Sequence, residues 1–135
     1  MTTPTVLNAQ DVVKTYGKGA AAFKALRGVS LEIKQGESIA IIGKSGSGKS
    51  TLMHLLALLD KPTSGSIDVD GHVSAKLSNR KLNDLRNNKF GFVFQQFFLN
   101  ANATVLENVI LPLKIAGVSS RERKRLGMAV LDKVE

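Results

Sequence analysis

The chain of 135 residues has a hydrophobic content of 43%, a charged content of 22% and a formal net charge of +8. Such a chain can bury a sizeable core, so we expect one soluble domain, residues 1–135. The absence of cysteine excludes disulfides and thiolate metal sites. The first residues do not resemble a secretory signal, and the longest apolar runs, such as Leu55 to Leu59, are too short to span a bilayer. We therefore expect a cytoplasmic protein.

Residues 6–16 are predicted to be extended, and residues 17–22, Gly-Lys-Gly-Ala-Ala-Ala, to form a loop. In the next segment Val29, Leu31 and Ile33 alternate with polar residues, which predicts a half-buried strand. Ser38–Ile42 is a continuous apolar run, which is typical of a strand buried on both faces.

Residues 50–59 are apolar nearly all round, which predicts a core helix that ends before Asp60. Residues 63–73 combine a turn, an alternating strand and the Asp70-Gly71 pair that is typical of a hairpin. A short helix should follow, with Ser78 as its N-cap and with Leu77 and Leu82 packed across the cap.

Phe90–Phe94 is predicted to be a second buried strand. Two capping boxes then indicate helix starts, Thr104 with Glu107 and Ser119 with Glu122. The second helix should bury a face that contains Leu126, Val130 and Val134. The sequence ends before this helix shows a stop signal, and we expect a fragment of a larger α/β protein.

Ten basic residues fall in two clusters, which are predicted to be solvated helix faces or, alternatively, a surface for an anionic partner. Neither cluster interleaves aromatic residues, so we do not expect nucleic acid as a partner. The clusters are Lys76, Arg80, Lys81, Arg86 and Lys89, and Lys114, Arg121, Arg123, Lys124 and Arg125.

Residues 43–50, Gly-Lys-Ser-Gly-Ser-Gly-Lys-Ser, satisfy the phosphate-loop (Walker A) pattern G-x-x-x-x-G-K-[ST]. Glycines let successive backbone N–H groups surround a phosphate chain, and the following helix directs its positive dipole end at the same group. Lys49 can reach the β- and γ-phosphates, the Ser50 hydroxyl can ligate Mg²⁺, and Thr51 can donate a further hydrogen bond. The predicted binding residues are Gly43, Lys44, Ser45, Gly46, Ser47, Gly48, Lys49, Ser50 and Thr51.

A glycine-rich loop can also be a simple connection between a strand and a helix. Here the pattern follows an expected strand and opens an expected helix, and this context favours nucleotide binding. The motif alone does not name a reaction, because kinases, GTPases and motor ATPases share it.

The order of motifs narrows the class of protein. Tyr16, the loop, the segments "DKPTSGSIDVDG" and "GFVFQQF", and "ENVILPL" together resemble the nucleotide-binding subunit of an ATP-binding cassette (ABC) transporter. The chain is similar to the branch that includes lipoprotein-release and macrolide-export ATPases. The resemblance implies an α/β fold with a phosphate-loop core and an N-terminal antiparallel β portion, truncated at the start of the helical subdomain.

The resemblance also implies roles for residues outside the loop. Tyr16 would stack on the adenine ring, and Gln95, in the Q-loop region 90–99, would ligate Mg²⁺ and contact the attacking water. Gln96 is the alternative to Gln95. Lys49 and Gln95 are thus the expected catalytic residues, Ser50 and Gln95 the expected metal ligands, and ATP with Mg²⁺ the expected cofactors.

The implied partners are a transmembrane permease subunit and a second copy of the ATP-binding subunit. Residues 96–107 would lie near the groove that receives the permease, with Phe97, Phe98 and Leu99 as a candidate exposed apolar patch or, alternatively, folded back into the helical region. The protein would then lie on the inner face of the cell membrane.

Lys44 and the polar segment "NANAT" depart from the usual pattern of the family. The family's acidic Mg²⁺ strand with its catalytic glutamate, its signature loop and its switch histidine would all lie beyond residue 135. We therefore expect this chain to bind ATP and to hydrolyse little of it. The alternatives are another phosphate-loop enzyme, such as a kinase, and a non-catalytic nucleotide-binding module.

Overall fold

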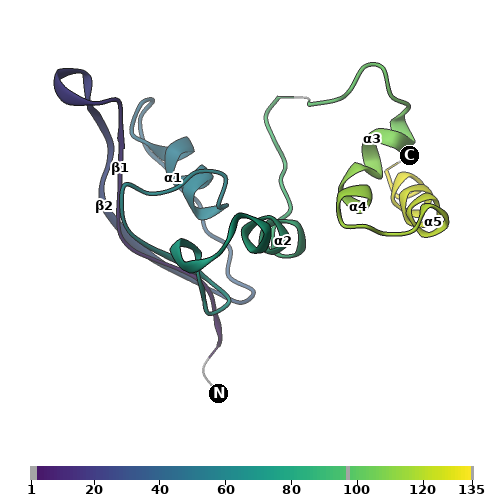
Figure 1. Ribbon diagram of the computed structural model, residues 1–135, viewed down its shortest axis with the longest axis horizontal. Helices are drawn as coiled ribbons and strands as arrows, with labels where there is room; N and C mark the ends of the chain where they lie inside the picture. The colour runs from purple at the N-terminus through teal and green to yellow at the C-terminus, as the bar shows by residue number, and fades with distance from the viewer. Residues whose placement is uncertain (1–2, 97, 135) are drawn as a thin grey trace. The chain divides into compact units, whose positions relative to one another are not determined.

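The computed structural model describes residues 3–96 and 98–134 (Figure 1). These residues form two compact units, Met1–Arg86 and Asn87–Glu135. The first unit contains a β-sheet, and the second is built from short helices.

The sheet of the first unit has four antiparallel strands in the order β2-β1-β3-β4. Long strands β1 (Thr5–Tyr16) and β2 (Phe23–Lys34) run side by side in Figure 1, joined by a loop that contains the 3-10 turn η1 (Gly19–Ala21). Strand β3 (Ser64–Val69) pairs with the other edge of β1, and β4 (His72–Val73) completes the hairpin. The expected antiparallel portion and the Asp70-Gly71 hairpin are confirmed.

Helix α1 (Lys49–Leu56) contacts β1 and β2 and closes the core. Val12, Leu55 and Ile67 are almost completely buried there. The helix ends three residues earlier than expected, because Leu58 adopts a left-handed conformation (φ 57°) and the His54 carbonyl accepts from the N–H of Leu59. Met53 is 54% exposed, so the helix buries one side rather than its whole surface.

Helix α2 (Asn79–Lys89) follows the 3-10 turn η2 (Ser74–Lys76). The Ser78 hydroxyl accepts a hydrogen bond from the N–H of Lys81, which confirms the predicted N-cap. Leu82 and Leu85 are buried on one side of this helix.

Two predicted strands are wrong. Ser38–Ile42 and Phe90–Phe94 are not strands, and Ile42 and Val93 are 89% and 103% exposed. A strand exists only where a neighbouring strand pairs with its backbone, and none of the sheet strands in residues 3–96 and 98–134 pairs with either segment. An apolar run supplies the side chains for a buried strand but not its hydrogen-bonding partners.

The second unit contains α3 (Val105–Val109), α4 (Leu111–Ile115) and α5 (Ser120–Leu131). The capping box at α3 is complete, since Thr104 Oγ1 accepts from the N–H of Glu107 while Glu107 Oε2 accepts from the N–H of Thr104. At α5 Ser119 caps the helix as predicted, but the Glu122 carboxylate pairs with Arg125 instead of closing the box.

The predicted apolar face of α5 is only partly correct. Leu126 is half-buried, but Val130 is 52% exposed, and Val134 lies beyond the helix and is 76% exposed. The helix instead packs through Gly127, where an added Cβ would lie 2.8 Å from a methyl group of Leu106. A periodicity argument misses a contact of this kind, because glycine has no side chain to mark it.

Candidate functional site

The glycine-rich loop lies between residues 38–42, which form no regular secondary structure, and helix α1. A turn closes it, with the N–H of Ser47 donating to the carbonyl of Lys44 at 3.2 Å. Gly48 is the N-cap of α1, and its carbonyl accepts the first helical bond, from Leu52, at 2.8 Å. The first N–H groups of a helix have no partner within it, so the start of α1 presents donors and a positive dipole end to the loop.

Close contacts with backbone require glycine at one loop position, and a second glycine lies against a loop side chain. At Gly48 φ is 90°, and an added Cβ would lie 2.7 Å from the carbonyl oxygen of Ala25 and 2.9 Å from a methyl group of Leu26. At Gly43 an added Cβ would lie 2.8 Å from Ser47 Oγ. The loop is therefore packed directly on strand β2, and a larger residue at Gly48 would push it away.

The Lys49 side chain folds back across the loop. Its Nζ donates to the carbonyls of Gly43 and Lys44, both at 2.8 Å. An ammonium group has three hydrogens, so this arrangement fixes the charge inside the loop and leaves one donor for an anion.

A cavity of about 340 Å³ lies against the loop. It is lined by Phe23, Ala25, Ser45, Gly46, Gly48, Lys49, Ser50 and Thr51. The structure thus brings together six of the predicted loop residues, whereas Gly43, Lys44 and Ser47 do not line the cavity. Sequence reasoning missed Phe23 and Ala25. No motif in the sequence marks these two residues; the hairpin register of the structure places Phe23 opposite Tyr16.

Tyr16 lies near the same end of the hairpin but outside the lining of this cavity. Its hydroxyl donates to Asp60 Oδ2 at 3.2 Å, and the Lys14 ammonium lies 4.9 Å from its ring centroid. Lys14 also pairs with Asp60 at 2.7 Å, and this hydrogen bond lowers the pKa of the Asp60 carboxyl below its ordinary value. Tyr16 is thus held by two charged residues, one of which covers a face of its ring.

Gln95 belongs to the second unit, where it is exposed at a bend. Gln96 lies at the same bend and is also exposed. Phe98 and Leu99 are each 71% exposed, as the candidate apolar patch requires, and Phe97 lies outside the described residues. The Phe98 ring meets the Phe94 ring edge-on, 5.1 Å apart.

The two basic clusters are mainly solvated. Eight of the ten residues are exposed, whereas Arg86 and Arg123 are half-buried. Arg123 Nη1 donates to the carbonyl of Val118 at 2.6 Å, and Arg86 Nη1 donates to that of Leu58 at 3.3 Å. These two side chains satisfy backbone carbonyls within their own units.

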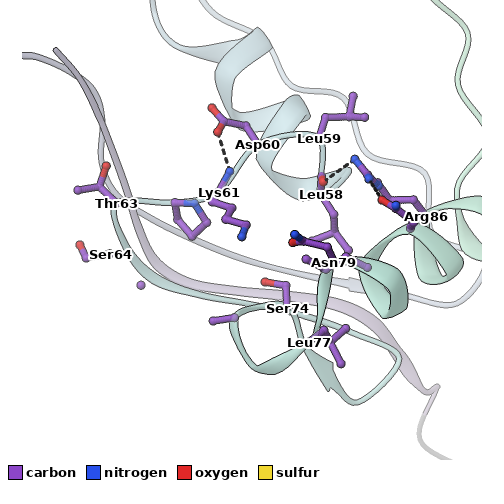
Figure 2. A pocket seen from close by; sticks show the side chains of 15 residues that line it. Leu58, Leu59, Asp60, Lys61, Thr63, Ser64, Ser74, Leu77, Asn79 and Arg86 are labelled. Atoms are coloured by element: carbon purple, nitrogen blue, oxygen red, sulfur yellow. Dashed lines mark hydrogen bonds between the residues drawn. The ribbon is translucent and has the colours of Figure 1, made fainter.

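Figure 2 shows a second cavity, of about 690 Å³, in the first unit. It lies between the end of α1, the start of β3, η2 and α2, and Arg86 enters it beside Leu58 and Asn79. None of the predicted site residues lines it. The loop cavity, although smaller, is therefore the candidate site.

No helix in the described part of the chain is long and apolar enough to cross a membrane.

A glycine-rich loop that opens a helix, with a lysine held inside the loop, defines a phosphate-binding loop protein. The ABC transporter family model matches residues 26–134, and the chain belongs to this family. Membership argues against the alternative of an unrelated phosphate-loop enzyme such as a kinase.

Several curated relatives are similar over nearly the whole chain. An uncharacterized ABC transporter ATP-binding protein of Thermotoga maritima is 47% identical over 96% of this chain and 55% of its own length. The lipoprotein-releasing system ATP-binding protein LolD of Saccharophagus degradans is 46% identical over 99% of this chain and 58% of its own. The macrolide export ATP-binding/permease protein MacB of Hyphomonas neptunium is 43% identical over 98% of this chain and 20% of its own.

The solved structures agree with the curated relatives. The chain is similar to the ATP-binding cassette MJ0796, in a dimeric post-hydrolysis state bound to ADP and Pi, with a TM-score of 0.83 and 41% identity. The match covers 93% of this chain and 56% of that one. The chain thus spans slightly more than half the length of the cassettes it resembles.

Proposed function

We propose that the loop Gly43–Thr51 binds the triphosphate of ATP with Mg²⁺, and that the full-length protein is the ATP-binding subunit of a transporter. The observation that carries this proposal is the loop itself, packed on β2 with the Lys49 ammonium fixed inside it. Membership of the ABC transporter family supports the same function. The relatives named LolD and MacB support membership of the lipoprotein-release and macrolide-export branch of the family. They do not identify the substrate of this protein.

Each residue of the loop has a proposed task. Lys49 turns its remaining hydrogen toward the β- and γ-phosphates, and the N–H groups at the start of α1 bind phosphate oxygens. Ser50 is exposed and lines the cavity, and its hydroxyl is a suitable ligand for Mg²⁺, while Thr51 donates to a phosphate. The metal would neutralise charge that develops on the phosphates during transfer.

The residues outside the loop have roles that rest on the family pattern alone. Tyr16 would contact adenine, and the amide oxygen of Gln95 would ligate Mg²⁺ and position the attacking water. A second copy of the subunit and a separate membrane permease are the proposed partners, the former supported by the dimeric state of MJ0796. Through the permease the protein would lie on the inner face of the cell membrane. The exposed Phe98 and Leu99 would suit such docking.

The test of the loop is a titration of the purified protein with MgATP by calorimetry. Lys49→Ala should weaken binding about tenfold to a hundredfold, because it removes a charged hydrogen bond to phosphate. Lys81→Ala is the matched control, since it removes one positive charge from the exposed face of α2 and should leave the affinity unchanged. Equal affinities for the wild type and Lys49→Ala would contradict the proposal.

Turnover is a separate measurement on the same preparation. We expect these 135 residues to release little or no phosphate from ATP, because the family's general base has no counterpart among them. Measurable turnover that Lys49→Ala abolishes would refute this expectation while leaving the binding function intact.

A further inference from the structure

The larger cavity of the first unit has the dimensions of a small-molecule site. Its volume is about 690 Å³, and such sites range from about 300 to 1,000 Å³. All of its lining residues belong to the first unit, and they come from the end of α1, the start of β3, η2 and α2 (Figure 2). No motif of the sequence accounts for it. The apolar part of its wall includes Leu58, Pro62, Ala75, Leu77 and Leu82.

Arg86 is a charged residue that is held in the wall of this cavity. Its Nη1 donates to the carbonyl of Leu58 at 3.3 Å, and its Nη2 donates to the side-chain oxygen of Asn83. These two bonds orient the planar guanidinium, while its other three N–H groups make no hydrogen bond within the described residues. A half-buried guanidinium with donors to spare is well suited to a carboxylate, because its fork matches the two carboxylate oxygens.

The charge around the cavity favours an anion. Asp60 also lines the cavity, but its carboxylate already pairs with Lys14 at 2.7 Å and accepts from the N–H of Lys61 at 2.7 Å. The side chains of Lys61 and Arg86 form no ion pair within the described residues. The lining therefore has two uncompensated positive charges and no uncompensated negative charge.

A buried hydroxyl belongs to the same lining. Ser74 is only 9% exposed, yet its Oγ has no hydrogen-bond partner within the described residues. Buried polar side chains normally have such a partner, because leaving one unsatisfied costs free energy. A ligand oxygen in the cavity would supply the partner that the described part of the chain does not provide.

We propose that this cavity binds an amphipathic carboxylate, a small acid with one charged end and an apolar body. The carboxylate accepts hydrogen bonds from Arg86 and Ser74. The apolar body lies against the leucines of the wall, Leu77 and Leu82 among them. The site is independent of the proposed nucleotide function, since no residue of the phosphate loop lines it.

The test uses octanoate as the probe, with octanol as its uncharged counterpart and acetate as its counterpart without a tail. Each is titrated into the purified protein by calorimetry. We expect octanoate to bind at one site and the other two to bind at least about tenfold more weakly. Arg86→Gln should weaken octanoate about tenfold, because it removes the charged hydrogen bonds. Arg80→Gln is the matched control, since Arg80 is exposed on the same helix and lies outside the lining.

Arg86→Gln also removes the bond to the Leu58 carbonyl, so two further variants test the site without disturbing that contact. Ser74→Ala removes a hydroxyl that has no partner in the described part of the chain. It should melt at or above the wild-type temperature and bind octanoate about threefold to tenfold more weakly. Ala75→Phe, at an exposed position of the lining, should block the cavity and abolish octanoate binding with little change in melting temperature.

Several results would overturn the proposal. Equal affinities for octanoate and octanol would show that the charge plays no part, and unchanged octanoate affinity in Ala75→Phe would show that the acid binds elsewhere. Lys49→Ala should bind octanoate as the wild type does, and a loss in that variant would assign the acid to the phosphate loop. A wild type without saturable octanoate binding would show that the cavity holds water only. The nucleotide function is tested by MgATP alone, so either proposal can fail while the other stands.

Discussion

The two units of the chain differ in how they bury apolar side chains. In the first unit a four-stranded sheet and α1 enclose Val12, Leu55 and Ile67, which are at most 1% exposed. In the second unit Gly127 is the one buried residue among those described, and Phe92 and Val93 are 40% and 103% exposed. Both units have apolar segments, so the difference does not come from composition.

The difference between the units shows that the pairing of strands decides which apolar side chains become buried. Strands β1, β2 and β3 find hydrogen-bonded neighbours within the described residues, and α1 covers the sheet they form. The rings of Phe90, Phe92 and Phe94 instead stack on one another along a segment with which no strand of the described residues pairs. Stacking covers part of each ring, but the backbone N–H and C=O groups of the segment and the side chains on its other face remain in water.

The largest expected effect is on the core of the first unit. Leu55→Ala should lower the free energy of unfolding by about 2–5 kcal/mol, since it leaves a cavity between α1 and the sheet. Urea unfolding, monitored by circular dichroism, measures this free energy. Val105→Ala, at a position that is 68% exposed in α3, should change the same quantity by less than about 0.5 kcal/mol. Similar losses in the two variants would break the contrast between the units.

A smaller effect is expected at the tight contact of Gly127 in the second unit. Gly127→Ala improves helix propensity by about 1 kcal/mol but forces a Cβ against Leu106 and Ile110, which costs about 1–3 kcal/mol. We expect a net loss, visible as faster amide hydrogen exchange in α5. Met128→Ala, at an exposed neighbouring position, should leave the exchange rates nearly unchanged. Slower exchange in Gly127→Ala would show that α5 does not depend on this contact.

The smallest effect concerns the ion pair that holds Tyr16. The Lys14 hydrogen bond lowers the pKa of Asp60, so the pair stabilises the folded state above the ordinary aspartate pKa, and this stability is lost as pH falls through the lowered pKa. At pH 7 Asp60→Asn should be less stable than the wild type by up to about 1 kcal/mol. Unfolding curves should show the difference fading below about pH 4.

Asp132→Asn, at an exposed position in the other unit, is the control and should show a smaller difference at pH 7. A deficit of Asp60→Asn that persisted undiminished at pH 2 would contradict a role for the charged carboxylate.

Local signals in the sequence predicted the local features correctly. The Asp70-Gly71 hairpin, the Ser78 and Ser119 caps and the complete Thr104–Glu107 box all form where the pattern indicates. Each depends on residues within a few positions of one another, so the sequence contains the whole interaction. The glycine-rich loop and the start of α1 at Lys49 belong to the same class.

Predictions that needed a distant partner were less successful. The segments 38–42 and 90–94 have the apolar pattern of buried strands, but no described strand pairs with them. The burial of Gly127 depends on Leu106 and Ile110, which belong to other helices. Phe23 was missed because its place beside the loop results from the packing of Gly48 on β2.

The sequence by itself therefore determined the chemistry of the site, because the residues that form a phosphate loop are consecutive and their tasks follow from their types and spacing. Only the tertiary structure decided what surrounds that loop. It set Phe23 against the cavity and tied Tyr16 to Asp60, which lies 44 positions further along the chain, beside the Lys14–Asp60 ion pair. The physical reason is that strand pairing and close packing act through space, and one-dimensional spacing does not record them.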